Sequence, residues 1–312
     1  MKLKQTLKEK ITALKNKKNA IILAHYYQDT EIQDIADYVG DSLGLSQKAA
    51  ETTADIIVFA GVHFMAETAK ILNPTKKVVL PDLNAGCSLA ESCPADSFEK
   101  FVRKHPNHTV VTYVNCSAEV KALTDIVCTS SNALKIVESI PAETPIIFAP
   151  DRNLGNYIMQ ETGREMLLWD GSCVVHEAFS LDKLAELCQK YPDYKIIAHP
   201  ESEEHILKTA TYVGSTAGMI KYVKEHPTGK FIVATEVGIL HKMKQEVPTA
   251  ELIPAPVKED TTCACSECAY MKVNTMQKLY DCLATESPTI EVDKTIRERA
   301  LIPIQRMLDI SK

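Results

Sequence analysis

The stretch AIILAHYYQ, residues 20–28, is a run of mostly β-branched and apolar residues that ends in Ala-His. Two counterparts follow later in the chain, TVVTYVNCS at residues 109–117 and YKIIAHPES at residues 194–202. The three stretches align His25, Tyr113 and His199. A short apolar run of this kind is typical of a buried strand. Its recurrence at a regular interval indicates an internal repeat.

A second landmark recurs at the same interval. The stretches YVGDSLG (38–44), IVCTSSN (126–132) and YVGSTAG (212–218) align Ser42, Ser130 and Thr216, and we interpret each as a short strand that runs into the start of a helix. The separation from Ser42 to Ser130 is 88 residues, and to Thr216 it is 174. The first landmark shows the same two separations. This shared register favours a triplication over chance similarity.

Each repeat continues with two more apolar runs. The first of them is DIIVFAG (55–61), PIIFAPD (145–151) or KFIVATE (230–236), and the second is KKVVLPD (76–82), EMLLWDG (165–171) or AELIPAP (250–256). Short buried strands that alternate with helices predict parallel sheets covered by helices. We therefore predict an α/β fold of three units around a pseudo-threefold axis. Because ligands bind beyond the carboxyl ends of parallel strands, we expect the active site at the centre.

The repeat also suggests a division of the chain. We assign residues 1–86, with an N-terminal helix, to the first unit, 87–172 to the second and 173–262 to the third. Residues 263–312 are assigned to a cysteine loop and C-terminal helices that pack back on the core. Leu3, Leu7, Ile11 and Leu14 have the spacing of an amphipathic helix. Residues 293–311 are interpreted as a capping helix.

Composition narrows the class of function. The 312-residue chain is 45% hydrophobic and carries a net charge of −6, so it has no broad basic field for nucleic acid. It contains no secretory leader and no apolar run of membrane-spanning length, so we expect a cytoplasmic protein without a membrane partner. In that compartment the ten cysteines are expected to bind metal, take part in redox chemistry or be buried.

In every unit a cysteine follows the last apolar run. These are Cys87, Cys173 and a member of the segment CACSEC at residues 263–268. Three thiolates that meet at one end of the axis would leave one metal coordination position open, unlike a structural site. On a 4Fe–4S cluster, which normally has four thiolates, they would leave one iron free to act as a Lewis acid.

The other cysteines have simpler interpretations. Cys93 is interpreted as structural, and the remaining four outside the segment as small buried apolar residues: Cys116, Cys128, Cys188 and Cys282. Spacing does not decide which of Cys263, Cys265 and Cys268 is the ligand. A local zinc site on these three, or a redox pair of Cys265 with Cys268, remains an alternative.

Nine stretches together resemble the quinolinate synthase family. They are HYYQDTEIQDIADYVGDSL, PDLNAGCSLAESCPAD, TYVNCSAEVKA, CTSSNA, PDRNLGNY, WDGSCVVHEAF, HPESE, GSTAGM and CAYMKVNTM. They span nearly the whole chain in the family's order. The resemblance implies a triplicated α/β fold with a central site, and one 4Fe–4S cluster per chain on Cys87, Cys173 and Cys268. Cys268 matches because the family ligand precedes an aromatic–Met pair, here Tyr270-Met271 after Ala269.

The chain departs from the family pattern in two places. It has Ala269 where the family often has Pro, and its cysteines read C-x-C-x-x-C where some members have C-x-x-C-x-x-C. These differences weaken a redox role for Cys263 and Cys265 and leave Cys268 as the implied ligand.

The resemblance also implies a reaction. Iminoaspartate (iminosuccinate) and dihydroxyacetone phosphate would condense to quinolinate with release of phosphate and two waters, in NAD biosynthesis. The implied catalytic residues are Tyr27, His25, Glu201, His199 and Tyr113. The implied substrate-binding residues are His25, Ser42, Tyr113, Val114, Asn115, Ser130, His176, His199, Pro200, Glu201 and Thr216. Pathway logic adds an aspartate oxidase or dehydrogenase that supplies the unstable iminoaspartate.

Two other functions remain open from the residues. One is an iron–sulfur hydro-lyase that acts on another small carboxylate, which would not consume dihydroxyacetone phosphate. The other is a zinc-holding scaffold or redox sensor built on the cysteines of residues 263–268, which would leave Cys87 and Cys173 without a role.

Overall fold

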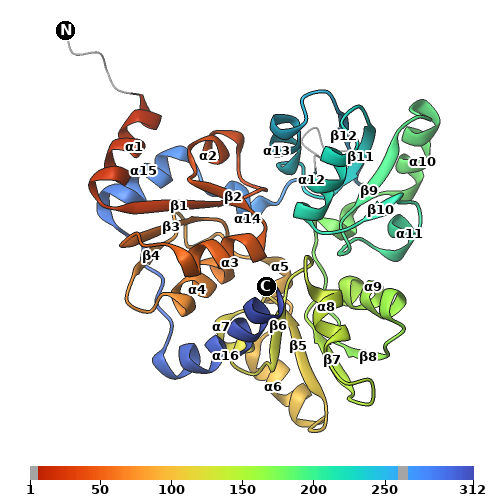
Figure 1. Ribbon diagram of the computed structural model, residues 1–312, viewed down its shortest axis with the longest axis horizontal. Coiled ribbons are helices and arrows are strands. Elements are labelled where there is room, and N and C mark those ends of the chain that lie inside the picture. Colours follow the sequence, from red (N-terminus) through yellow and green to blue (C-terminus); the bar gives the residue numbers. More distant parts are fainter. Residues whose placement is uncertain (1–5, 259–265) are drawn as a thin grey trace.

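Three small parallel sheets surround a common centre in the computed structural model, which describes residues 6–258 and 266–312 (Figure 1). Their strand orders are β2-β1-β3-β4, β6-β5-β7-β8 and β10-β9-β11-β12, one order used three times. The strands are β1 (Ala20–His25), β2 (Tyr38–Gly40), β3 (Ile56–Ala60), β4 (Lys77–Val79), β5 (Thr109–Tyr113), β6 (Ile126–Cys128), β7 (Ile146–Ala149), β8 (Met166–Leu168), β9 (Lys195–Ala198), β10 (Tyr212–Val213), β11 (Lys230–Ala234) and β12 (Glu251–Pro254). The predicted α/β fold of three units is confirmed.

Helices connect the strands and cover the sheets. They are α1 (Leu7–Lys17), α2 (Thr30–Ile35), α3 (Ser42–Glu51), α4 (His63–Leu72), α5 (Ser88–Glu91), α6 (Ala95–Arg103), α7 (Ala118–Lys121), α8 (Ala133–Glu138), α9 (Arg152–Thr162), η1 (His176–Ala178), α10 (Leu181–Lys190), α11 (Glu204–Leu207), α12 (Thr216–Glu225), α13 (Ile239–Glu246), α14 (Ala269–Lys272), α15 (Met276–Thr285) and α16 (Lys294–Ile310). No helix of the described residues is both long and apolar enough to cross a bilayer.

The register of the strands repeats from unit to unit. Ala24, Thr112 and Ala198 each pair with an alanine that ends the neighbouring strand: Ala60, Ala149 and Ala234. The next residue in each case is His25, Tyr113 or His199. These three side chains therefore leave their sheets at the same level, at the carboxyl ends of the strands.

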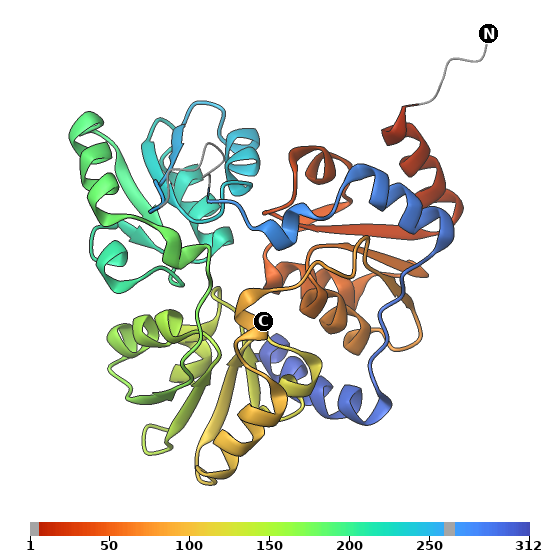
Figure 2. The ribbon, with the colours of Figure 1, turned by 180° about the vertical axis from the view of Figure 1, so that it is seen from behind.

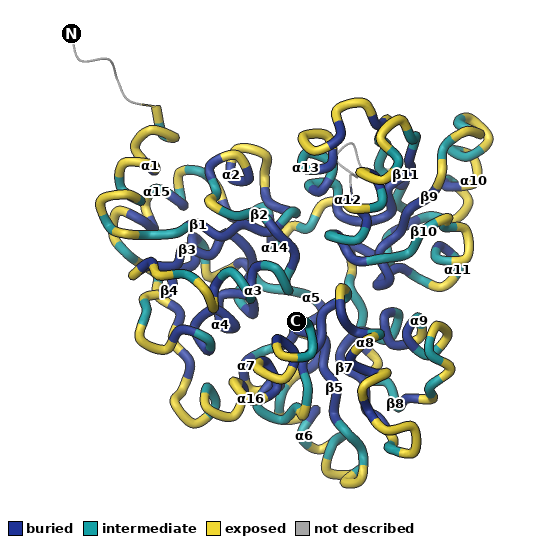
Figure 3. Tube along the Cα trace, in the orientation of Figure 1, coloured by how far each residue is buried: buried dark blue, intermediate teal, exposed yellow. Residues whose placement is uncertain are grey.

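Alternating side chains divide the core into two layers, because successive residues of a strand face opposite sides of a sheet. Leu23, Val111 and Ile197 belong to the largest core cluster, which contains residues of all three units. The residues just before them, Ile22, Val110 and Ile196, belong to separate outer clusters under the covering helices. Figure 3 shows the inner strands of each sheet as mostly buried.

The C-terminal segment ties the units together. From the third unit the chain crosses to the first through α14 and α15 (Figure 2), and α15 packs against α1. Helix α16 then packs on α4 of the first unit and on α7 and β6 of the second. Its cap residues, Asp293 and Ser311, are the ends of the predicted capping helix.

The proposed unit boundaries fall between the sheets. The sheets occupy residues 20–79, 109–168 and 195–254, so boundaries at residues 87 and 173 interrupt none of them. The boundary at residue 263 and the first residues of the predicted N-terminal helix, including Leu3, lie outside the described part of the chain.

Candidate active site

A central cavity opens where the three sheets converge. The space between its walls, including the part that is open to solvent, measures about 620 Å³. Thirteen of the predicted site residues line it: His25, Tyr27, Ser42, Cys87, Tyr113, Asn115, Ser130, Cys173, His176, His199, Glu201, Thr216 and Cys268. They come from all three units and from the C-terminal segment.

Two predicted substrate-binding residues do not line the cavity. Val114 is buried in the central apolar core, and its N–H donates to the carbonyl of Cys128 at 2.8 Å. Pro200 is buried between His199 and Glu201 without reaching the cavity wall.

His25 and His199 each accept a hydrogen bond from the backbone two residues later. The N–H of Tyr27 donates to Nδ1 of His25 at 3.2 Å, and the N–H of Glu201 donates to Nδ1 of His199 at 3.4 Å. Nδ1 is therefore an acceptor in both rings, and the proton of the neutral imidazole is on Nε2. Burial lowers the pKa of each histidine to about 3. Both rings are thus neutral hydrogen-bond donors at neutral pH.

The hydroxyls at two helix starts are not used as caps. Ser42 and Thr216 are the first residues of α3 and α12, whereas the N-caps are the preceding Asp41 and Ser215. Each N-cap side chain accepts the N–H of a glycine three residues later. The hydroxyls of Ser42 and Thr216 line the cavity beside helix N-termini, which favour anions.

The structure corrects the prediction that Ser130 opens a helix. Helix α8 begins three residues later, because the Asn132 side chain accepts the N–H of Thr129 at 2.7 Å and forms a turn first. In this turn Ser130 Oγ lies 3.1 Å from His199 Nε2. Since that nitrogen carries the ring proton, Ser130 accepts it and keeps its own O–H for a ligand.

Glu201 is one of the buried carboxyl groups of the cavity wall. The hydroxyl of Tyr113 donates to its Oε1 at 2.6 Å, and Nδ1 of His176 lies 3.4 Å from its Oε2. Burial opposes ionisation, but His176 and the tyrosine hydroxyl outweigh it, so the pKa of Glu201 lies below its usual range. Burial, followed by the charge of Glu201, raises the pKa of Tyr27 and of Tyr113 well above 10.

The sequence prediction missed four polar residues of the site. Asp41, Thr129 and Glu236 line the cavity, and Thr235 lies directly behind it. Glu236 is fully buried, accepts the N–H of Cys268 at 3.3 Å and is paired with Lys272 at 3.4 Å. The repeat offered a signal for two of them, because Thr235 and Glu236 follow β11 as Pro150 and Asp151 follow β7.

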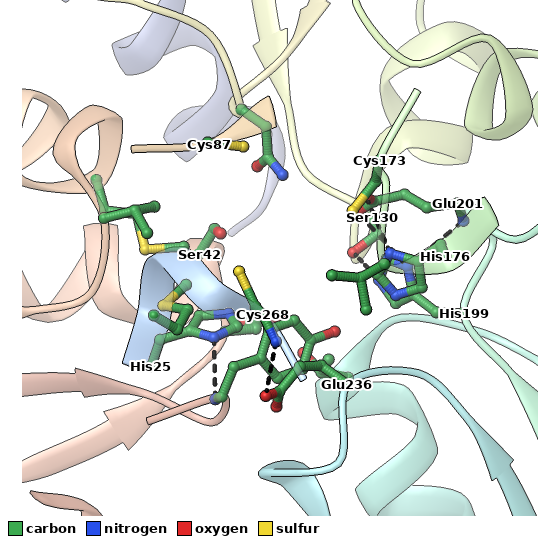
Figure 4. Close-up of a pocket in the computed structure, with 18 of the residues that line it drawn as sticks. His25, Ser42, Cys87, Ser130, Cys173, His176, His199, Glu201, Glu236 and Cys268 are labelled. Atoms are coloured by element: carbon green, nitrogen blue, oxygen red, sulfur yellow. Dashed lines mark hydrogen bonds and ion pairs between the residues drawn. The ribbon is translucent and has the colours of Figure 1, made fainter. Parts of the chain in front are cut away.

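The three cysteines of the resemblance meet in the cavity. Figure 4 shows the sulfur atoms of Cys87, Cys173 and Cys268 directed toward one open space. All three are free thiols, and Cys263 and Cys265 lie outside the described residues. The backbone N–H three residues later interacts with each sulfur, from Ala90, His176 and Met271 respectively.

This donor set fits an iron–sulfur cluster. Thiolates are its usual ligands, and N–H groups directed at sulfur are among the protein contacts that tune such clusters. Burial raises the pKa of all three thiols, for Cys87 to about 12, so a bound metal must displace their protons. A second grouping, Cys173 with His176 and Glu201, has its ligand atoms within 4.8 Å of one another and the ligand types of a single zinc ion.

The electrostatics of the wall also restrict the ligand. None of the described residues that line the cavity is Lys or Arg. An anionic ligand must therefore be held by neutral N–H and O–H donors, by helix N-termini and by any bound metal.

Known proteins resemble the chain over nearly its whole length. The family model described as "Quinolinate synthetase A protein" matches residues 9–309. A protein named quinolinate synthase from Synechococcus sp. is 59% identical over 96% of this chain and 94% of its own length. Another so named, from Gloeothece citriformis, is 59% identical over 97% and 93%. A solved UDP-GlcNAc 2-epimerase from Neisseria meningitidis covers 78% of this chain and 67% of its own with a TM-score of 0.16, too weak a likeness to carry an argument.

Proposed function

Because the chain belongs to the quinolinate synthase family, we propose that it condenses iminoaspartate with dihydroxyacetone phosphate to quinolinate, releasing phosphate and two waters. The observation that carries the proposal is the composition of the central cavity. Three free thiols from different parts of the chain face a space whose wall carries neutral donors and the buried carboxyl groups of Asp41, Glu201 and Glu236. Both substrates are small anions, which suits the neutral donors.

We propose that Cys87, Cys173 and Cys268 hold one 4Fe–4S cluster. When bound, the cluster supplies a Lewis acid through the iron that no cysteine occupies. The convergence of the three thiols supports this assignment and leaves a scaffold or sensor built on residues 263–268 alone without a role for Cys87 and Cys173.

Neutral donors would bind the carboxylates and the phosphate. His25 donates through Nε2–H, and Ser130 donates its hydroxyl because His199 already supplies a proton to its oxygen. Ser42 and Thr216 add hydroxyls and free N–H groups at the starts of α3 and α12. This arrangement orients anions without a fixed positive charge in the wall.

The buried tyrosines and Glu201 would carry out the proton transfers. Ionised Glu201 can accept a proton at Oε1 or Oε2, while the raised pKa of Tyr27 keeps its hydroxyl protonated, so that it can donate. Tyr113 holds Glu201 Oε1 and shares its proton with it. His199 and His25 act as oriented donors in this scheme.

The proposal extends to the setting of the enzyme. Iminoaspartate is unstable, so an aspartate oxidase or dehydrogenase is proposed to supply it. A cytoplasmic location is proposed as well, and it is supported by the free state of all eight described cysteines.

The test begins with anaerobic purification and a count of iron, acid-labile sulfide and zinc per chain. About four irons and four sulfides are expected. The protein is then supplied with iminoaspartate and dihydroxyacetone phosphate, and quinolinate and phosphate are measured. Zinc without sulfide, or turnover of a small carboxylate without consumption of dihydroxyacetone phosphate, would refute the proposal.

Tyr27→Phe tests the proposed donor. Removing the hydroxyl leaves the ring packing in place, so we expect kcat to fall about 100-fold or more while the cluster content is unchanged. Steady-state kinetics and metal analysis of the same preparation check this. Full turnover with an intact cluster would remove Tyr27 from the acid–base scheme.

A further inference from the structure

Thr235 joins two candidate site residues from behind the cavity. It follows β11 directly, and its side chain is 1% exposed. Its Oγ1 lies 2.7 Å from the hydroxyl of Tyr27 and 2.9 Å from Nε2 of His176. Its backbone carbonyl accepts the hydroxyl of Ser266 at 3.0 Å, which fixes this position against the segment that leads to Cys268.

Thr235 is the shared partner of these two side chains. Its hydroxyl has one proton, so it donates to one of the two and accepts from the other. On the far side of the ring, Nδ1 of His176 lies 3.4 Å from Oε2 of Glu201, a carboxylate that can only accept. The four polar groups therefore follow one another in space as Tyr27, Thr235, His176 and Glu201.

We infer that Thr235 is a positioning residue of the proposed reaction: its single hydroxyl orients the imidazole of His176 and the hydroxyl of Tyr27. The inference rests on the proposed function and goes beyond it, since Thr235 does not line the cavity. It links Tyr27 of the first unit to Glu201 of the third through a continuous chain of polar groups.

A methyl group in place of the hydroxyl removes the link with little change of shape. Thr235→Val leaves Nε2 of His176 and the hydroxyl of Tyr27 without their shared buried partner, which costs orientation at both. The residues that hold the anions, His25 and Ser130, make no hydrogen bond to Thr235. The defect should therefore lie in kcat and not in binding.

The experiment compares Thr235→Val with Thr235→Ser in the cluster-loaded enzyme. We expect the valine variant to lose roughly 10- to 100-fold in kcat, while KM and the Kd of added quinolinate change less than about threefold. The serine variant, which keeps the hydroxyl, should retain kcat within about threefold. Iron content and the melting temperature of each variant establish that folding and cluster are intact.

The comparison also separates the two claims. A wild-type enzyme that makes no quinolinate contradicts the proposed function. An active wild type with valine kcat within about twofold, or with equal losses in valine and serine, overturns the role of Thr235 alone. If the valine variant does not fold, Thr235→Ala against Thr235→Ser repeats the test, because these two differ only in the hydroxyl. Equal kcat in that pair also overturns the inference.

Discussion

His25 and His199 make the folded protein less stable as the pH falls, because both are neutral in the folded state. Both side chains are buried and have a pKa of about 3, far below the ordinary 6.5. In the window between these values the unfolded chain binds a proton at each histidine and the folded chain does not. The free energy of unfolding therefore rises with pH through this window and is lost as the pH falls.

The matching prediction concerns acid stability. From pH 7 to pH 5 each histidine should lower the free energy of unfolding by about 2 kcal/mol, so His199→Gln should be less sensitive to pH by that amount. Anaerobic urea unfolding at the two pH values measures the difference. His205→Gln is the control, since that side chain is 42% exposed and should leave the wild-type pH response. Equal responses in all three proteins would contradict the assignment.

Helix α16 packs across the first and second units and holds them together. One face packs on α4, α7 and β6, and the residues of this face include Ala300, Ile304 and Met307. Because the helix belongs to neither sheet, its contribution to stability depends on this contact.

A matched pair of alanine variants tests the packing of α16. Ile304 is fully buried, whereas Ile302 on the same helix is 54% exposed. We expect Ile304→Ala to lower the free energy of unfolding by about 2–5 kcal/mol, and Ile302→Ala to change it by less than about 0.5 kcal/mol. Urea denaturation followed by circular dichroism gives both values. Similar effects at the two positions would mean that α16 does not pack as described.

The whole molecule assembles the proposed cluster site. Cys87 precedes α5, Cys173 precedes η1 and Cys268 precedes α14, so the three thiols meet only when the units and the C-terminal segment are packed together. Lys272 helps to hold this junction: it donates to the carbonyl of Tyr27 at 3.0 Å and pairs with Glu236 of the third unit.

Loss of any one thiol should therefore abolish the cluster. Cys87→Ser, Cys173→Ser and Cys268→Ser are each expected to retain only a small fraction of the wild-type iron and sulfide after anaerobic purification. Cys188→Ser, in α10 and away from the cavity, is the control and should load fully. A fully loaded variant among the first three would exclude that cysteine as a ligand.

Much of this site was predictable from the repeat. His25, Tyr113 and His199 could be aligned because strands in the same register end at equivalent positions. The turn that replaces the predicted helix start at Ser130 could not be predicted from the repeat. It forms because the Asn132 side chain accepts a backbone N–H of the same segment. Thr235 and Glu236 were missed although the repeat aligns them with Pro150 and Asp151, because such an alignment does not show which contacts a side chain makes.

The sequence by itself determined three α/β units, the polar residues at their strand ends and the capping helix, since each depends on patterns within a short segment. Only the tertiary structure decided that three thiols share one cavity with Glu201, and that Thr235 lies between Tyr27 and His176. These contacts join residues far apart in the chain. They follow from how the three units pack against one another, which no local spacing encodes.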